Sequence, residues 1–308
     1  MAKQKSRTHK YITTQLFNFA RDSYLERTSR PIYAIAFLLP LIVLYEIGTV
    51  LINTDVLNHS QVRVVAFVWL QGFLEYLGAG GKLAWAAPPL VVVIILLGLQ
   101  LASRKQWHLS LNDFGPMTVE CALLSVPLIV LSLFLNRPVD SNAGISGFAP
   151  AAVAAGTEVV VRNAAAISVC SSDVDAIATR TEKQTNSLLA SIVTGIGAGI
   201  YEELVFRLIL ICLLMLLFQD LLQLSHENSI VLSVLISAAL FSAHHHVMLI
   251  DGRFGIGAPF NWMEFGFRTI AGTYFAILFA IRGFAVAAGT HAFYDIIATI
   301  VNAVFFAS

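Results

Sequence analysis

The sequence predicts an all-α fold, a polytopic membrane helix bundle of about eight transmembrane helices. Three observations support this prediction: 57% of the 308 residues are apolar, only 12% are charged, and long apolar stretches recur along the chain. An ordinary soluble domain carries roughly 25% charged residues, and about 20 apolar residues are enough to span a bilayer as a helix. The composition therefore indicates an integral, multi-pass membrane protein.

A basic arm precedes the first apolar stretch and covers residues 1–31. Its cationic residues outnumber its two acids, Asp22 and Glu26. They are Lys3, Lys5, Arg7, Lys10, Arg21, Arg27 and Arg30. Because positive charge beside a membrane helix tends to stay in the cytoplasm, we expect a cytoplasmic N-terminus followed by an uncleaved anchor helix. The membrane would be a bacterial inner membrane, or the endoplasmic reticulum in a eukaryotic host.

Eight apolar segments are candidate spans. Their limits are roughly 32–52, 64–81, 84–103, 117–135, 187–222, 228–248, 264–281 and 284–305. The segment 64–81 is amphipathic and contains Gln71 and Glu75, so it could lie at the interface instead. Eight spans place more of the loop Lys and Arg residues on the cytoplasmic side than seven spans do, which favours eight.

These limits divide the chain into four regions. After the arm, residues 32–135 form the amino-terminal transmembrane helices, residues 136–186 a polar loop or small extramembrane lobe, and residues 187–305 a second helix bundle. The three cysteines are widely spaced without a CxxC pair, which argues against a disulfide framework or a cysteine zinc site.

The stretch GIYEELVFRLIL (199–210) places three charged residues inside an apolar helix. Each costs at least about 2.5–3.5 kcal/mol at bilayer depth, so each needs a partner or a function. Glu203 and Arg207 are four residues apart and can pair on one helix face. Glu202 points about 100° away and is left without that arginine. The alternative is a purely structural charge cluster that holds two helices together.

Two more polar groups follow in later apolar stretches. Phe241 and His245 share a helix face in SAALFSAHHHVML, and His291 and Asp295 do so in GTHAFYDIIATI. Taken singly, the histidines could form an idle interfacial cluster, and His291 with Asp295 a self-satisfying pair. Three such groups on successive apolar stretches favour one convergent site. The span limits put His245 and His291 near opposite membrane faces, so convergence requires tilted, longer or broken helices.

The other membrane-protease signatures are missing or misplaced. No HExxH motif occurs, the GISG of 144–147 lies in the polar loop, and the FYD of 293–295 has no accompanying GxGD. A glutamate with two histidines remains. A buried glutamate can act as general base on a water while a histidine donates to the developing oxyanion, which suffices for peptide hydrolysis without a covalent intermediate.

The ordered motifs EExxxR, FxxxH and HxxxN/D, each in an apolar stretch, resemble the CPBP (ABI) family. This family contains the type II CAAX prenyl endopeptidases and relatives linked to bacteriocin processing and immunity. The resemblance covers about 187–305. It rests on Glu202, Glu203, Arg207, Phe241, His245, His291 and Asp295.

The resemblance implies an all-helical intramembrane endopeptidase. Glu202 and His245 would activate the water, and His291 and Asp295 would hold the oxyanion side. Glu203, Arg207 and Phe241 would support these groups.

One position departs from the prenyl endopeptidases, which tend to have Asn where this chain has Asp295. An ionised Asp cannot donate a hydrogen bond, so Asp295 could instead orient His291. It could also complete a zinc site with a glutamate and two histidines; otherwise no cofactor is expected.

The expected partners are the lipid bilayer and a membrane-anchored or lipidated protein or peptide substrate, and we expect no nucleic-acid partner. Two alternatives stay open: a non-catalytic peptide-binding, immunity or scaffold protein, and a proton-coupled transporter.

Overall fold

The computed structural model describes residues 19–20, 22–53, 64–78, 86–135, 173–250, 253–256 and 260–305. For residues 53, 173–187, 247–250 and 253–256 only the backbone is described. Over this part the regular secondary structure is helical apart from one antiparallel hairpin, β1 (Val247–Ile250) with β2 (Arg253–Ile256). The helices are α1 (Tyr24–Thr28), α2 (Pro31–Asn53), α3 (Val65–Tyr76), α4 (Ala87–Ser103), the short 3-10 turn η2 (Leu111–Asp113), α5 (Phe114–Leu135), α6 (Asp173–Glu203), the π-helical η3 (Leu204–Leu210), α7 (Ile211–Met215), the π-helical η4 (Leu216–Leu221), α8 (His226–His244), α9 (Trp262–Arg282) and α10 (Phe284–Phe305).

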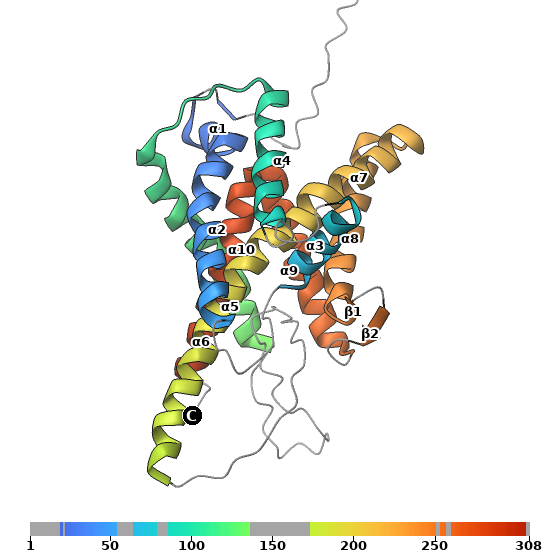
Figure 1. The fold of residues 1–308 in the computed structure, drawn as a ribbon. Coiled ribbons are helices and arrows are strands. Elements are labelled where there is room, and N and C mark those ends of the chain that lie inside the picture. The colour runs from blue at the N-terminus through green and yellow to red at the C-terminus, as the bar shows by residue number, and fades with distance from the viewer. Residues whose placement is uncertain are drawn as a thin grey trace, which may run out of the picture.

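The prediction of a polytopic helical membrane protein is confirmed. Among the described residues, six helical stretches are long and apolar enough to cross a bilayer. They are Pro31–Ile52, Leu111–Leu135, Leu188–Leu221, His226–His244, Trp262–Arg282 and Phe284–Phe305. The apolar helix Ala87–Ser103 is shorter, at 17 residues. Figure 1 shows these helices gathered side by side into one bundle.

The segment expected over 64–81 does not form a span. Helix α3 has 12 residues and stops before Gly78, which has a left-handed φ of +106°. Its length is about 18 Å, well short of the roughly 30 Å hydrocarbon core. The helix ends at Tyr76, and Gly78 follows its C-cap Leu77 in the left-handed conformation.

A contact between α2 and α4 also indicates that α3 does not cross the bilayer. The backbone N–H of Ile32, at the start of α2, donates to Oε1 of Gln100, near the end of α4, over 3.1 Å. The start of α2 and the end of α4 therefore lie at one end of the bundle, so α4 runs back antiparallel to α2. A further span between them would place these residues at opposite ends.

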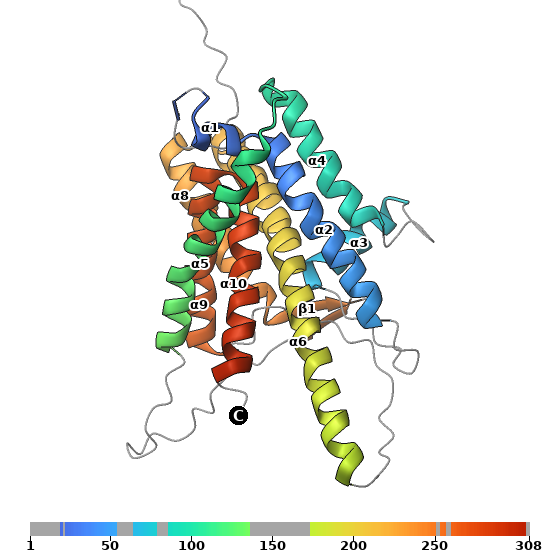
Figure 2. The same cartoon turned by 90° about the vertical axis from the view of Figure 1, so that its left-hand side faces the viewer.

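The polar region expected over 136–186 is described only from residue 173 onward; residues 136–172, like the basic arm up to residue 18, lie outside the described part. Helix α6 begins at Asp173, earlier than the expected limit of 187. Figures 1 and 2 show its first turns projecting beyond the other helices. Part of the expected loop is therefore a helical extension of the span that follows.

Glycines on α6 bring α6 and α10 into close contact. A Cβ added at Gly199 would lie 2.5 Å from the backbone N of Ala292, and one at Gly195 would lie 2.7 Å from Cβ of Asp295. Small residues four apart let membrane helices approach this closely. The face of α10 that carries Asp295 is thereby pressed against α6.

Candidate active site

Glu202 and Glu203 are the last residues of α6, where the helix passes into the π-helical segment η3. Single π-helical turns within α-helices are frequent at functional sites. Neighbouring helices hold this segment: the Ser237 hydroxyl on α8 donates to the Phe206 carbonyl over 2.6 Å, and Arg207 Nη2 donates to the Gly272 carbonyl on α9 over 3.1 Å. The two glutamates thus project from a segment fixed on two sides.

Glu203 is paired inside the protein. Its Oε2 lies 3.1 Å from Arg207 Nε, and its Oε1 lies 2.9 Å from His291 Nδ1. Arg207 is fully buried, and its guanidinium carbon lies 4.2 Å from the Phe241 ring centroid, a cation–π contact. Because a carboxylate only accepts, His291 donates from Nδ1, and the neutral ring presents a lone pair at Nε2.

Glu202 lies between two histidines from different helices. Its Oε1 is 3.7 Å from His244 Nε2, and its Oε2 is 3.8 Å from His291 Nε2. The side chain is almost completely buried. Both distances exceed the 3.2 Å limit of a direct hydrogen bond. A water or an ion could bridge groups at this separation.

His244 and His245 form the carboxyl end of α8, with His245 as the C-cap. Their Nδ1 atoms lie 2.5 and 2.9 Å from the Phe241 carbonyl oxygen, so both rings donate from Nδ1. His245 is only 1% exposed although it follows the last helical residue. α8 ends at His244, and the chain continues from there into the hairpin β1–β2.

His244 is a residue that the motif reading missed. The FxxxH spacing selects His245, yet His244 also faces Glu202, with its Nε2 3.7 Å from Oε1 of that acid. The signal was available, because residues three apart also share a helix face and Phe241 is three residues before His244. The Phe241 ring contacts both histidine rings, with centroids 5.5 and 5.3 Å away.

Asp295 lies beside His291 without a direct hydrogen bond to it. Its Oδ2 is 3.6 Å from His291 Nε2, and within the described part of the chain neither carboxyl oxygen has a hydrogen-bond partner. The side chain is fully buried. Glu203, not Asp295, makes the hydrogen bond that sets the His291 tautomer.

Glu202, His244 and His245 could hold a metal ion. One ligand atom from each lies within 4.8 Å of the others, and all three residues are buried. Two histidines and a glutamate form a donor set that suits zinc. The zinc set expected from the sequence contained His291 and Asp295 in place of His244.

Aromatic rings wall the site. Phe275 on α9 stacks on His291 with ring centroids 4.4 Å apart, and Phe206 lies 4.8 Å from His244. Trp69 on α3 stands edge-on to His244 at 5.7 Å. These rings exclude bulk water and lower the local dielectric, which strengthens interactions between charges.

The fold and this cluster define a polytopic helical membrane protein with buried acid and histidine side chains inside its helix bundle. Residues 184–297 match the model of a protein family described as type II CAAX prenyl endopeptidase Rce1-like. No curated protein and no solved structure matches the chain. The chain therefore carries an Rce1-like type II CAAX prenyl endopeptidase (CPBP) family domain over these residues, and the resemblance inferred from the motifs is confirmed.

Proposed function

We propose that this protein is an intramembrane endopeptidase, which hydrolyses a peptide bond of a membrane-anchored or lipidated substrate with a water activated by Glu202. The observation that carries the proposal is the position of Glu202. Its two carboxylate oxygens face histidines on α8 and α10 across gaps of 3.7 and 3.8 Å. A water in either gap would touch a base and an imidazole at once.

In this mechanism Glu202 takes a proton from the water, whose oxygen attacks the carbonyl carbon of the scissile bond. His245, next to His244, shares the proton on the α8 side. A tetrahedral intermediate forms with negative charge on the former carbonyl oxygen, on the side of His291 and Asp295. The C–N bond then breaks as the proton passes from Glu202 to the leaving amine, and a carboxylic acid and an amine result.

Glu203, Arg207 and Phe241 act as support. Glu203 holds His291 by its Nδ1. Arg207 compensates the charge of Glu203 and ties η3 to α9. The Phe241 carbonyl accepts a hydrogen bond from Nδ1 of both His244 and His245, so the Nε2 atom of each ring is available to the water or the substrate.

The location of the site supports a membrane-anchored substrate. Glu202 lies near the middle of the span Leu188–Leu221. A scissile bond would have to reach bilayer depth, and a lipid or membrane anchor on the substrate would bring it there. A cytoplasmic N-terminus in a bacterial inner membrane is part of the same proposal.

The test is Glu202→Gln, which keeps the shape of the side chain and removes the base. Protein termini are compared by mass spectrometry in membranes of cells that express wild type or variant at equal levels. New termini that appear only with the wild-type protein are the expected result and identify the substrate. Glu264→Gln, which removes a partly buried acid paired with Arg268 on α9 at 3.6 Å, is the matched control and should cleave like wild type. Identical termini, with any cellular phenotype retained by Glu202→Gln, would overturn the proposal in favour of peptide binding.

A zinc-dependent form of the same hydrolysis is the second candidate, favoured by the spacing of Glu202, His244 and His245. Purified protein is dialysed against a chelator and assayed with and without added Zn²⁺. Loss of cleavage that Zn²⁺ restores would support a metal form. Full activity after dialysis, with protein-bound zinc below a tenth of an equivalent, would support activation by Glu202 without metal.

A further inference from the structure

The proposed hydrolysis needs a hydrogen-bond donor for the oxyanion, and the catalytic cluster has few to offer. Oxyanion donors must be N–H or O–H groups about 2.7–3.1 Å from the charged oxygen. The Nδ1–H groups of His244 and His245 are directed to the Phe241 carbonyl, and that of His291 to Glu203. His291 therefore presents an Nε2–H only as an imidazolium.

The other polar side chains of the cluster do not supply a neutral donor. Glu202 and Asp295 only accept when ionised. Arg207 is paired with Glu203 through Nε and donates to the Gly272 carbonyl through Nη2; its Nη1 has no partner among the described residues, but it belongs to a charged group. A neutral donor must therefore come from another residue, and the buried donors without a partner among the described residues include Thr290 Oγ1 and Tyr294 Oη on α10 and the indole Nε1 of Trp69 on α3. Of these three, Trp69 has its ring against His244.

Trp69 on α3 carries such a donor. Its indole Nε1 is buried and has no hydrogen-bond partner within the described residues. An indole N–H can only donate, and leaving a buried donor unsatisfied costs about 1–3 kcal/mol. An N–H kept in this state beside a reactive cluster is suited to an acceptor that arrives with a ligand.

The placement of α3 brings this donor to the site. The Trp69 ring stands at 69° to the His244 ring, with centroids 5.7 Å apart. Two residues earlier, Phe67 packs edge to face on Tyr201, with centroids 5.0 Å apart. Tyr201 is the residue before Glu202. The short helix α3 thus packs against both α6 and α8, beside Glu202 and His244. This position would explain why a helix too short to span the bilayer lies here.

We propose that the Trp69 indole N–H donates a hydrogen bond to the carbonyl oxygen of the scissile peptide bond and stabilises the oxyanion that forms there. This inference rests on the proposed function, because it assigns a further catalytic residue to the same reaction. No bond to Trp69 is made or broken: its proton stays on nitrogen while the oxygen gains charge.

The test is Trp69→Phe, which removes the N–H and keeps an aromatic ring against His244. Purified wild type and variant are assayed in detergent with an internally quenched farnesylated peptide that ends in a CAAX box, and in parallel by the abundance of wild-type-specific termini in membranes. We expect kcat to fall 30- to 300-fold, in the range of lost oxyanion donors, with KM changed less than threefold. Trp262→Phe, at a position 78% exposed on α9, makes the same chemical change outside the site and should leave both constants unchanged.

A second variant separates donation from packing. Trp69→His restores a ring N–H and should recover at least a tenth of the wild-type kcat, whereas Trp69→Ala should not. A Trp69→Phe enzyme within twofold of wild type in kcat, while Glu202→Gln is inactive, would overturn the role of Trp69 and leave the proposed function standing. An increase confined to KM would also overturn it, since it would make Trp69 a ground-state contact. Cleavage that survives Glu202→Gln would instead overturn the proposed function.

Discussion

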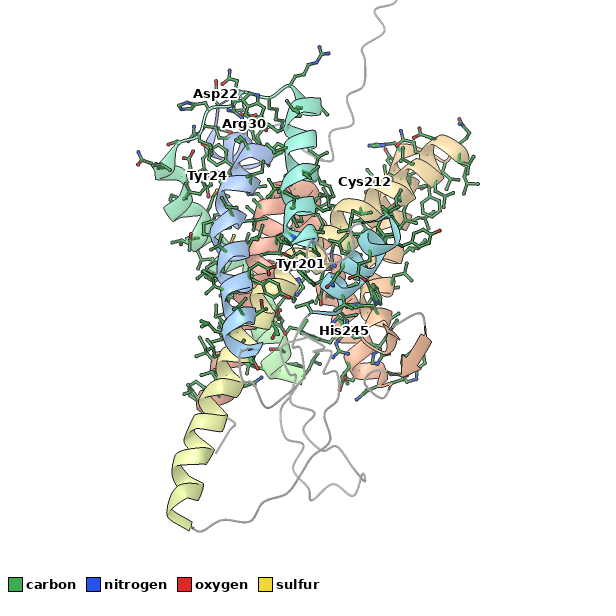
Figure 3. All side chains as sticks on the ribbon, viewed as in Figure 1. Asp22, Tyr24, Arg30, Tyr201, Cys212 and His245 are labelled. Carbon is green, nitrogen blue, oxygen red and sulfur yellow. The ribbon has the colours of Figure 1, made fainter. Side chains whose placement is uncertain are left out.

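Two groups of buried charges lie in different parts of this bundle, and they are partnered differently. At the end near α1, Arg282 donates to both carboxylate oxygens of Glu120 over 2.5 and 2.8 Å, and also to the Leu25 carbonyl and the Thr28 hydroxyl. Tyr24 adds a hydrogen bond of 2.7 Å to Glu120. We call these residues the α1 network. Figure 3 shows Tyr24 at this end of the bundle and His245 far from it, toward the hairpin.

At the candidate active site, two acids lack such close contacts, whereas Glu203 has them. Glu202 and Asp295 face histidine nitrogens at 3.6–3.8 Å, beyond hydrogen-bond range. A buried charge without close partners lowers stability. In the α1 network the charged groups bond directly to each other and so hold helices together. At the candidate active site, the separation of Glu202 and Asp295 from the histidines leaves room for a reactant. Close pairing is what a structural role requires, and the separation at Glu202 and Asp295 is what the proposed hydrolysis requires.

The largest expected effect is on the cluster. Glu202→Gln should lower cleavage at least 100-fold, because a general base contributes about 10²–10⁴-fold. Its melting temperature in detergent should equal or exceed that of wild type, because a buried charge without close partners is removed. Assays of cleavage and of thermal unfolding on one preparation check both points. A drop of several degrees would show that Glu202 is structural, as Glu120 is.

The second effect is on the α1 network. Glu120→Gln should lower the free energy of unfolding by about 2 kcal/mol, since it leaves Arg282 buried without its acid. Cleavage per folded molecule should stay within about twofold of wild type. Thermal unfolding in detergent measures the first quantity, with Glu264→Gln, the acid of the more exposed pair with Arg268, as a control expected to change stability by less than about 1 kcal/mol. Equal losses in both variants would contradict the structural role of the network.

The third effect concerns the contact that joins α6 to α10. Gly199→Ala should destabilise the protein by about 1–2 kcal/mol, because its Cβ would meet backbone atoms of Ala292 and Ala288 that cannot move aside cheaply. It should also reduce cleavage, since α10 carries His291. Gly98→Ala on α4 is the matched control: no atom lies within 4 Å of its Cβ, so stability should be unchanged or slightly higher. Thermal unfolding and cleavage of the two variants compare the sites directly, and a harmless Gly199→Ala would refute this packing argument.

The smallest effect is a pH dependence at the edge of the α1 network. The hydrogen bond from Arg30 lowers the pKa of the Glu26 carboxyl below its ordinary value of 4.5. A lowered pKa in the folded state adds stability above the ordinary pKa and loses it as the pH falls through the folded value. The melting temperature of wild type should therefore fall slightly more between pH 5 and pH 3 than that of Glu26→Gln, by an amount worth less than about 1 kcal/mol. Parallel curves for the two proteins would show that the pair adds nothing.

Much of the site was readable from spacing within single helices. The Glu203–Arg207 pair, and the shared face of His291 and Asp295, follow from residues four apart on one helix. The contact between Glu203 and His291 was not readable, because it joins α6 to α10. Helical periodicity specifies the direction of a side chain on its own helix and says nothing of the rotation and depth of the neighbouring helix.

The sequence by itself determined the class of this protein: an apolar, helical, multi-pass membrane protein with acids and histidines at intramembrane positions and the motifs of the CPBP family. Only the tertiary structure decided that His244 as well as His245 reaches Glu202, that Glu203 and not Asp295 sets the His291 tautomer, and that α3 covers the site instead of spanning. The physical reason is the same in each case. Composition and periodicity act along one helix, whereas these three outcomes depend on where a helix ends and how closely the next one packs against it.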